Sequence, residues 1–191
     1  MPDPNPEKIL PFSTCNKLNE WFKTHHAVES ELWVKIFKKH SGVSSVTWNE
    51  VVLEALCWGW IDGVKKSFDE ESYLQRITPR SKKSNWSKLN TKHVARLIKE
   101  GRMQPSGLVQ VDAAKADGRW EKAYALSEMQ VPQDFILALD NEPAAKQFFE
   151  TLPQSSRAMI AIGLTGAKKL ETRQRRFDKF MDMLVKGVKP N

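Results

Sequence analysis

The chain has 191 residues, of which 40% are hydrophobic and 28% charged, and its net charge is +7. A chain of this length buries roughly 70% of its unfolded surface, so it needs neither disulfides nor a metal to fold. Two cysteines without CxxC spacing exclude a secreted disulfide scaffold, and the lack of a leader or a long apolar run predicts a cytoplasmic protein without a membrane span.

The first elements are predicted to be a helix, a strand and a second helix. Apolar residues at helical spacing indicate a helix over residues 13–25. Residues 31–39 alternate, which is typical of a strand with Leu32, Val34 and Ile36 on one face. The TWNE segment at 47–50 is a capping box that opens an apolar helix ended by Gly59.

Two further strands are predicted to form a hairpin. They span residues 60–68 and 73–78, joined by an acidic turn. If Phe68 pairs with Tyr73, Asp62 lies opposite about Pro79 and next to Arg80.

The rest of the chain is predicted to be helical. Gly101 and Gly118 end two helices, and prolines at 132, 143 and 153 begin three more before a last helix over about 171–186. The fold class is therefore α+β, a small antiparallel sheet of about three strands with surrounding helices. We expect an α+β domain over residues 1–130 and a helical subdomain over 131–191.

Residues 56–124 carry an unusual density of tryptophan, arginine and glycine, and we interpret them as a recognition surface. The candidate ligand-binding residues are Trp58, Trp60, Asp62, Arg76, Arg80, Ser84, Trp86, Asn90, Arg119 and Trp120. The tryptophans either stack on a planar ligand or fill the core. Asp62 is a weak candidate for a catalytic acid or base, and otherwise forms an ion pair with Arg80 or Arg76. Cys57 is interpreted as a buried thiol rather than a nucleophile.

Positive charge is concentrated in the middle of the chain. Between Arg76 and Arg102 there are nine basic residues and one acid, Glu100. Such a run attracts phosphates or acidic partners, or is a solvated face. No nucleic-acid motif accompanies it, so non-specific nucleic-acid binding stays a weak alternative. The four histidines lack metal-ligand spacing, and we expect no metal and no cofactor.

Several motifs together resemble the bacterial YdeI/OmpD-associated family, also called bacteriocin-protection proteins. They are ALCWGWIDG (55–63), TPRSKKSNWSKLN (78–90), GRMQPSGL (101–108), DGRW (117–120) and AKKLETRQRRF (167–177). The resemblance extends over nearly the whole chain, from about Trp21. It implies a role in tolerance of bacteriocins or antimicrobial peptides and association with a porin, but no reaction.

Three functions follow as hypotheses. The first is a non-enzymatic binding protein with a Trp- and Arg-lined surface for an anionic small molecule or an acidic protein surface. The second is an enzyme for a small phosphorylated or nucleotide-like substrate, with Asp62 as acid–base residue and Arg80 as clamp. The third is nucleic-acid binding through residues 76–102.

Overall fold

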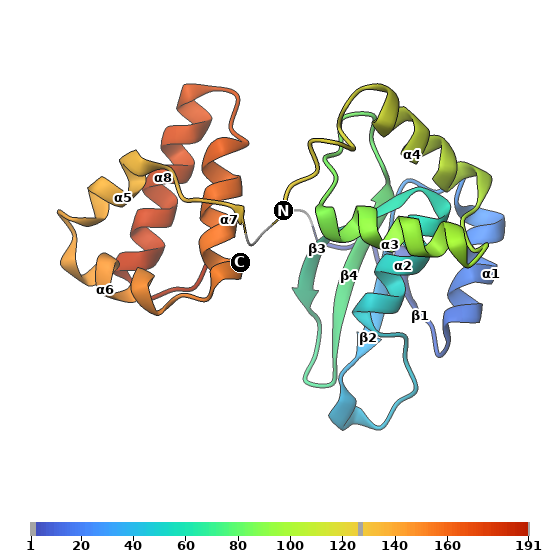
Figure 1. The fold of residues 1–191 in the computed structure, drawn as a ribbon. Helices are drawn as coiled ribbons and strands as arrows, with labels where there is room; N and C mark the ends of the chain where they lie inside the picture. Colours follow the sequence, from blue (N-terminus) through green and yellow to red (C-terminus); the bar gives the residue numbers. More distant parts are fainter. Residues whose placement is uncertain (1–2, 126–127, 191) are drawn as a thin grey trace. The chain divides into compact units, whose positions relative to one another are not determined.

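The computed structural model describes residues 3–125 and 128–190, and the chain divides into two compact units, 1–123 (unit 1) and 124–191 (unit 2). Helices and one sheet are both present, which confirms the α+β class (Figure 1). The division concerns compactness alone, so the predicted domain boundary after residue 130 stays a prediction.

Unit 1 combines a sheet with helices. Its elements are β1 (Ile9–Pro11), α1 (Cys15–His25), β2 (Leu32–Phe37), α2 (Trp48–Trp58), β3 (Trp60–Ser67), β4 (Ser72–Pro79), α3 (Lys88–Lys99) and α4 (Pro105–Ala116), with 3-10 turns at Pro6–Lys8 and Lys39–Ser41. Unit 2 is built from α5 (Gln133–Leu139), α6 (Pro143–Thr151), α7 (Gln154–Thr165) and α8 (Leu170–Val185).

The sheet has four strands rather than three, in the order β1-β2-β4-β3. The additional strand, β1, pairs in parallel with β2, while the other pairs are antiparallel. The sequence prediction missed β1 because three residues show no alternation and one of them is Pro11. A proline is tolerated there because β1 is an edge strand.

The predicted hairpin register was wrong. Ser67, not Phe68, pairs with Tyr73, and a bulge between Asp62 and Lys65 shifts the register again. A bulge places an extra residue on one strand, so the pairing changes along its length. Asp62 consequently lies opposite Ile77 instead of Pro79.

Helix α2 is the centre of unit 1, and its predicted ends are confirmed. Thr47 N donates to Glu50 Oε2 over 2.7 Å and Glu50 N donates to Thr47 Oγ1 over 3.3 Å, so both halves of the capping box form. Gly59 ends the helix with a φ of 78°, which favours glycine. The inward face of β2, with Leu32, Val34 and Ile36, joins the same core cluster.

The C-terminal end of α2 is tied to two distant segments. Arg80 N donates to Gly59 O and Gln104 N to Cys57 O, each over 3.0 Å. Helix α4 approaches so closely that a Cβ at Gly107 would lie 2.2 Å from Cys57 O. The end of α2 therefore fixes the backbone after β4 and the backbone before α4.

Unit 2 has its own apolar core. Phe135, Leu139, Ile160, Leu164 and Leu184 are buried in one cluster, with aromatic side chains of α8 packed against it. The helices predicted after prolines 132, 143 and 153 are confirmed, since Pro132 and Pro153 directly precede α5 and α7 and Pro143 begins α6.

Candidate functional site

The structure brings five of the predicted site residues together. These are Arg80, Ser84, Trp86, Arg119 and Trp120, here called the Arg80 cluster. The Arg80 guanidinium lies 3.8 Å from the centroid of the Trp86 ring, and its Nη1 donates to the carbonyl of Asn85 over 2.9 Å. The Trp86 and Trp120 rings are 4.9 Å apart, and Arg119 Nη1 donates to Ser84 O over 2.9 Å.

Two members of the Arg80 cluster are buried, and Ser84, Arg119 and Trp120 are half-buried around them. Arg80 is 5% exposed and Trp86 2% exposed. Cation–π stacking and a backbone carbonyl compensate for the loss of water around the guanidinium. Because Arg119 reaches Ser84 from the far end of α4, the loop between β4 and α3 is held at both its start and its middle.

The two tryptophans of the CWGW segment lie elsewhere. Trp60 is 1% exposed, packs edge-on against Phe22 and donates its Nε1 proton to His26 O over 3.1 Å. Trp58 is the last residue of α2 and stacks parallel to Phe22. Both contribute to the core cluster of unit 1. This packing favours core filling over ligand stacking for these two residues.

The remaining predicted residues are separated. Arg76 Nε binds Glu31 Oε2 over 2.7 Å, so this arginine is engaged away from Asp62. Asn90 lies in the first turn of α3, where its backbone N–H donates to the Ser87 cap.

Asp62 lies on β3 and is half-buried. Burial raises the pKa of Asp62, while a hydrogen bond with the side chain of Trp48 and the charge of Arg80 lower it by less. A carboxyl with a raised pKa is easier to protonate, which suits acid–base chemistry better than an ion pair does.

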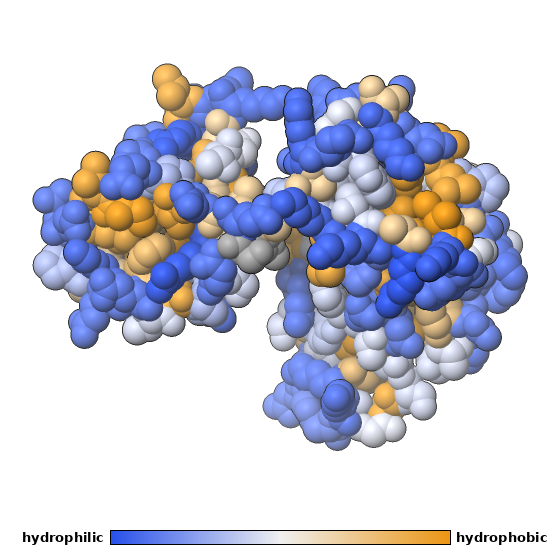
Figure 2. Space-filling model, in the orientation of Figure 1, coloured by the Kyte–Doolittle hydropathy of each residue, from blue (hydrophilic) through white to orange (hydrophobic). Residues whose placement is uncertain are grey.

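Exposed lysines and one arginine surround the Arg80 cluster in sequence. They are Lys82 and Lys83 in the loop and Lys88, Lys92, Arg96 and Lys99 on α3, together called the basic surface. Residues 88, 92 and 96 repeat every four positions, which aligns them along one side of the helix. Hydrophilic side chains lie over α3 in Figure 2.

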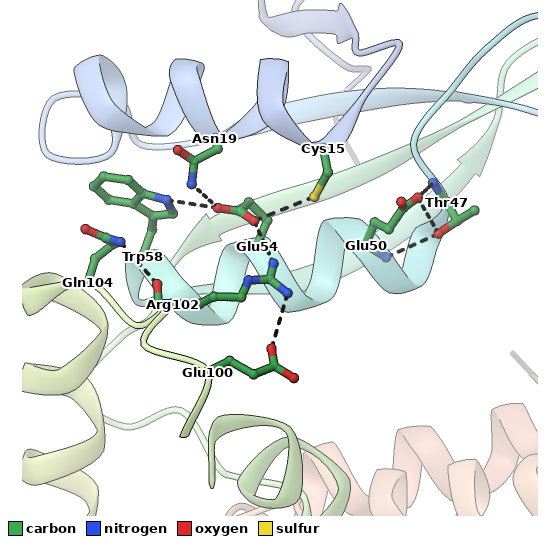
Figure 3. Close-up of polar contacts among 9 residues, drawn as sticks. All are labelled: Cys15, Asn19, Thr47, Glu50, Glu54, Trp58, Glu100, Arg102 and Gln104. Carbon is green, nitrogen blue, oxygen red and sulfur yellow. Dashed lines mark hydrogen bonds and ion pairs between the residues drawn. The ribbon is translucent and has the colours of Figure 1, made fainter. Parts of the chain in front are cut away.

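Sequence reasoning missed a second buried charge, Glu54 on α2, which is 3% exposed. Its carboxylate accepts hydrogen bonds from Asn19 Nδ2, from Trp58 Nε1 over 3.3 Å, and from Arg102 Nη2 over 3.1 Å. Cys15 Sγ contacts it at 3.6 Å. These five residues form the Glu54 cluster (Figure 3).

A pocket of about 520 Å³ adjoins the Glu54 cluster. Its lining comes from α1, from α2 and from the segment before α4: Cys15, Asn16, Asn19, Glu50, Leu53, Glu54 and Arg102. This volume is within the range of small-molecule sites. The sequence held one signal for it, because Glu54 is a lone acid within the otherwise apolar run 51–58.

Neither cysteine is activated. Burial first, and the Glu54 charge second, raise the pKa of Cys15 to about 11 and that of Cys57 to about 12. Both thiols are therefore protonated at neutral pH, and a protonated thiol is a poor nucleophile. The arrangement around Glu54 can bind polar groups but does not supply a thiolate.

Comparison with family models gives two matches. Residues 10–110, more than half of the chain, match the model described as Domain of unknown function (DUF8412). The chain belongs to this family. Residues 128–187 match the model described as Bacteriocin-protection, YdeI or OmpD-Associated. Neither the curated proteins nor the solved structures gave a match.

These matches correct the extent of the resemblance inferred from the sequence. The YdeI/OmpD-associated match covers only the C-terminal part, where the AKKLETRQRRF segment lies. The tryptophan-rich motifs at 55–63 and 78–90 instead lie in the DUF8412 match, as does the whole Glu54 cluster.

Within residues 3–125 and 128–190, no three His, Cys, Asp or Glu side chains are placed to hold a metal ion. None of the helices in this part of the chain is long and apolar enough to cross a membrane.

Proposed function

We propose that this DUF8412 protein is a non-enzymatic binding protein of the cytoplasm that presents its basic surface to an anionic ligand or an acidic protein partner. The observation that carries the proposal is the stacked pair of Arg80 and Trp86, which anchors the loop of that surface in the core. The loop bearing Lys82 and Lys83 lies between Arg80 and Trp86, which stack on each other in the core. Charges held in place lose less entropy on binding than mobile ones.

The charge balance of the basic surface supports this role. Lys82, Lys83 and Lys92 are exposed, and no ion pair to them is found within the described residues. On α3, Arg96 is offset by Glu100 at 3.5 Å. A field of uncompensated positive charge speeds encounters with anionic partners and favours them over other partners.

A contribution to bacteriocin tolerance is proposed for the same protein. Its support is the match of residues 128–187 to the bacteriocin-protection model. Unit 2 would supply this role, and unit 1 the recognition of the anionic partner.

The test is binding of three probes, polyglutamate, polyphosphate and a short single-stranded oligonucleotide, measured by fluorescence anisotropy at 50 and 200 mM salt. We expect the double variant Lys82→Glu, Lys83→Glu to weaken polyglutamate binding at least tenfold. The matched control, Lys168→Glu with Lys169→Glu, makes the same charge change in unit 2 and leaves the affinity unchanged.

Each result has a definite meaning. Equal losses in both double variants would show that net charge alone drives binding and would overturn the proposal. Preferential binding of the oligonucleotide, with a steep dependence on salt, would favour the nucleic-acid alternative.

The raised pKa of Asp62 favours one second candidate, an enzyme with Asp62 as acid–base residue. In this alternative Arg80 would clamp a phosphorylated substrate, although its guanidinium already contacts Trp86 and Asn85. Turnover of a phosphorylated substrate that disappears in a folded Asp62→Asn variant would establish it.

A further inference from the structure

We infer that the pocket beside Glu54 binds a small organic cation through a primary ammonium group. The inference is independent of the basic surface, which lies on other elements. Its basis is the charge of the pocket lining, which contains two carboxylates, Glu50 and Glu54, and the single guanidinium of Arg102.

The Glu54 carboxylate is already saturated. Asn19 and Trp58 donate to Oε1, while Arg102 and Cys15 donate to Oε2. A carboxylate accepts about four hydrogen bonds, so this group has no capacity left for a ligand. Glu54 is thus a positioning residue, which fixes the Asn19 amide and the Arg102 guanidinium at the pocket wall.

The Arg102 charge is offset from both sides. Its Nη2 lies 3.1 Å from Glu54, and its Nη1 lies 3.7 Å from the carboxylate of Glu100. A guanidinium between two carboxylates repels a nearby cation little, and its pull on an anion is similarly reduced. Net negative charge therefore remains at the pocket.

Glu50 supplies that charge. Its Oε2 accepts from both Thr47 N and Thr47 Oγ1, whereas its Oε1 accepts no hydrogen bond within the described residues. Figure 3 shows Glu50 and Glu54 on the same helix, α2, with Cys15 above them. The pocket lining thus includes a half-buried glutamate, one of whose carboxylate oxygens has unused acceptor capacity.

The asparagines complete a set of acceptors. Asn19 donates its Nδ2 to Glu54, which leaves its Oδ1 as an acceptor, and Asn16 is exposed at the pocket. An ammonium group has three N–H donors and no acceptor. One carboxylate oxygen and two amide oxygens can supply acceptors for that pattern, and the charge of the Glu50 carboxylate favours a cation.

The experiment uses three probes of equal length with the full chain: 1,4-diaminobutane, 1,4-butanediol and succinate. We expect calorimetry to detect only the diamine, and ¹⁵N NMR to show amide shifts over residues 15–19 and 50–54 on its addition. The variant Glu50→Gln should weaken the diamine about tenfold, which corresponds to about 1.4 kcal/mol. Glutamine also serves in a capping box, so the fold is kept.

The matched control is Glu70→Gln, which removes an exposed acid from the turn between β3 and β4 and leaves diamine binding unchanged. Succinate binding better than the diamine would overturn the inference and assign the pocket to Arg102. Equal binding of the diol and the diamine, or an unchanged affinity in a folded Glu50→Gln variant, would overturn it as well.

Discussion

Unit 1 buries two opposite charges, those of Glu54 and Arg80, and stabilises them by different contacts. Glu54 is surrounded by hydrogen-bond donors, one of which is the cation of Arg102. Arg80 instead lies against the face of Trp86 and donates to a backbone carbonyl. Burying a charge costs several kcal/mol unless it is paired, so each cluster must offset that cost by itself.

Both clusters depend on the same end of α2. Arg80 N binds Gly59 O, and Gln104 N, two residues after Arg102, binds Cys57 O. The difference lies in what surrounds each charge. The Trp86 ring, itself packed on Trp120, covers Arg80, whereas a pocket adjoins Glu54. A buried arginine in a tryptophan-rich motif can thus serve the fold, while the less conspicuous acid borders the space for a ligand.

The largest effect is expected from removing the negative charge. Glu54→Ala leaves Asn19, Trp58 and Arg102 without their acceptor, and we expect a loss of about 3 kcal/mol in unfolding free energy. Arg102 is partly exposed and can regain water, so the loss lies at the lower end for a buried pair. Urea denaturation measures it, with Glu29→Ala at a partly exposed ion pair as the control. Equal losses of unfolding free energy in the two variants would contradict the stabilising role of Glu54 as a shared hydrogen-bond acceptor.

Removing the positive charge should cost less. Arg80→Ala loses the stacking on Trp86 and the bond to Asn85, for a loss of about 2 kcal/mol in unfolding free energy. Arg80→Lys keeps the charge but not the planar contact, so it should recover only part of that loss. Urea denaturation measures the unfolding free energy of both variants. An Arg80→Lys variant as stable as the native protein would show that stacking on Trp86 contributes nothing to stability.

The sequence predicted what depends on neighbouring residues. The capping box at Thr47, the stop at Gly59 and the alternation of β2 are local signals, and each element was found. Strand β1 and the hairpin register were missed, because one needs pairing with a distant strand and the other depends on a bulge between Asp62 and Lys65.

The difference between local and distant contacts also explains which of the two sites could be predicted from the sequence. Arg80, Ser84 and Trp86 lie within one loop, so their grouping was visible in the sequence. The Glu54 cluster joins Cys15 to a position 39 residues later and Arg102 to one 48 residues earlier, and only the packing of α1 against α2 reveals it. No local sequence pattern specifies contacts between residues so far apart in the chain.

A smaller effect is expected in the reactivity of Cys15. Burial, with help from Glu54 and Glu50, raises the pKa of this thiol from 9.0 to about 11, which lowers the thiolate fraction at pH 7 roughly 100-fold. Removing a nearby negative charge lowers the pKa again. We expect Glu54→Gln to speed alkylation of Cys15 by iodoacetamide several-fold and Glu50→Gln less, followed by peptide mass spectrometry. Identical rates in all three proteins would show that burial alone controls the thiol.

The smallest effect on stability is expected at Asp62, whose pKa is lowered slightly by the charge of Arg80. Its folded pKa is raised by burial, so the ionised form costs stability, and the native protein becomes less stable as pH rises from the ordinary aspartate value through the raised one. Asp62→Asn stays neutral and keeps an oxygen for Trp48. Thermal unfolding should show equal stability at pH 3 and a gain of at most about 0.5 kcal/mol at pH 7, with Asp112→Asn on α4 unchanged. A loss of stability in Asp62→Asn at pH 7 would mean that the attraction of the Asp62 carboxylate to Arg80 outweighs the cost of burying it. Asp62 would then be a third charge that unit 1 stabilises.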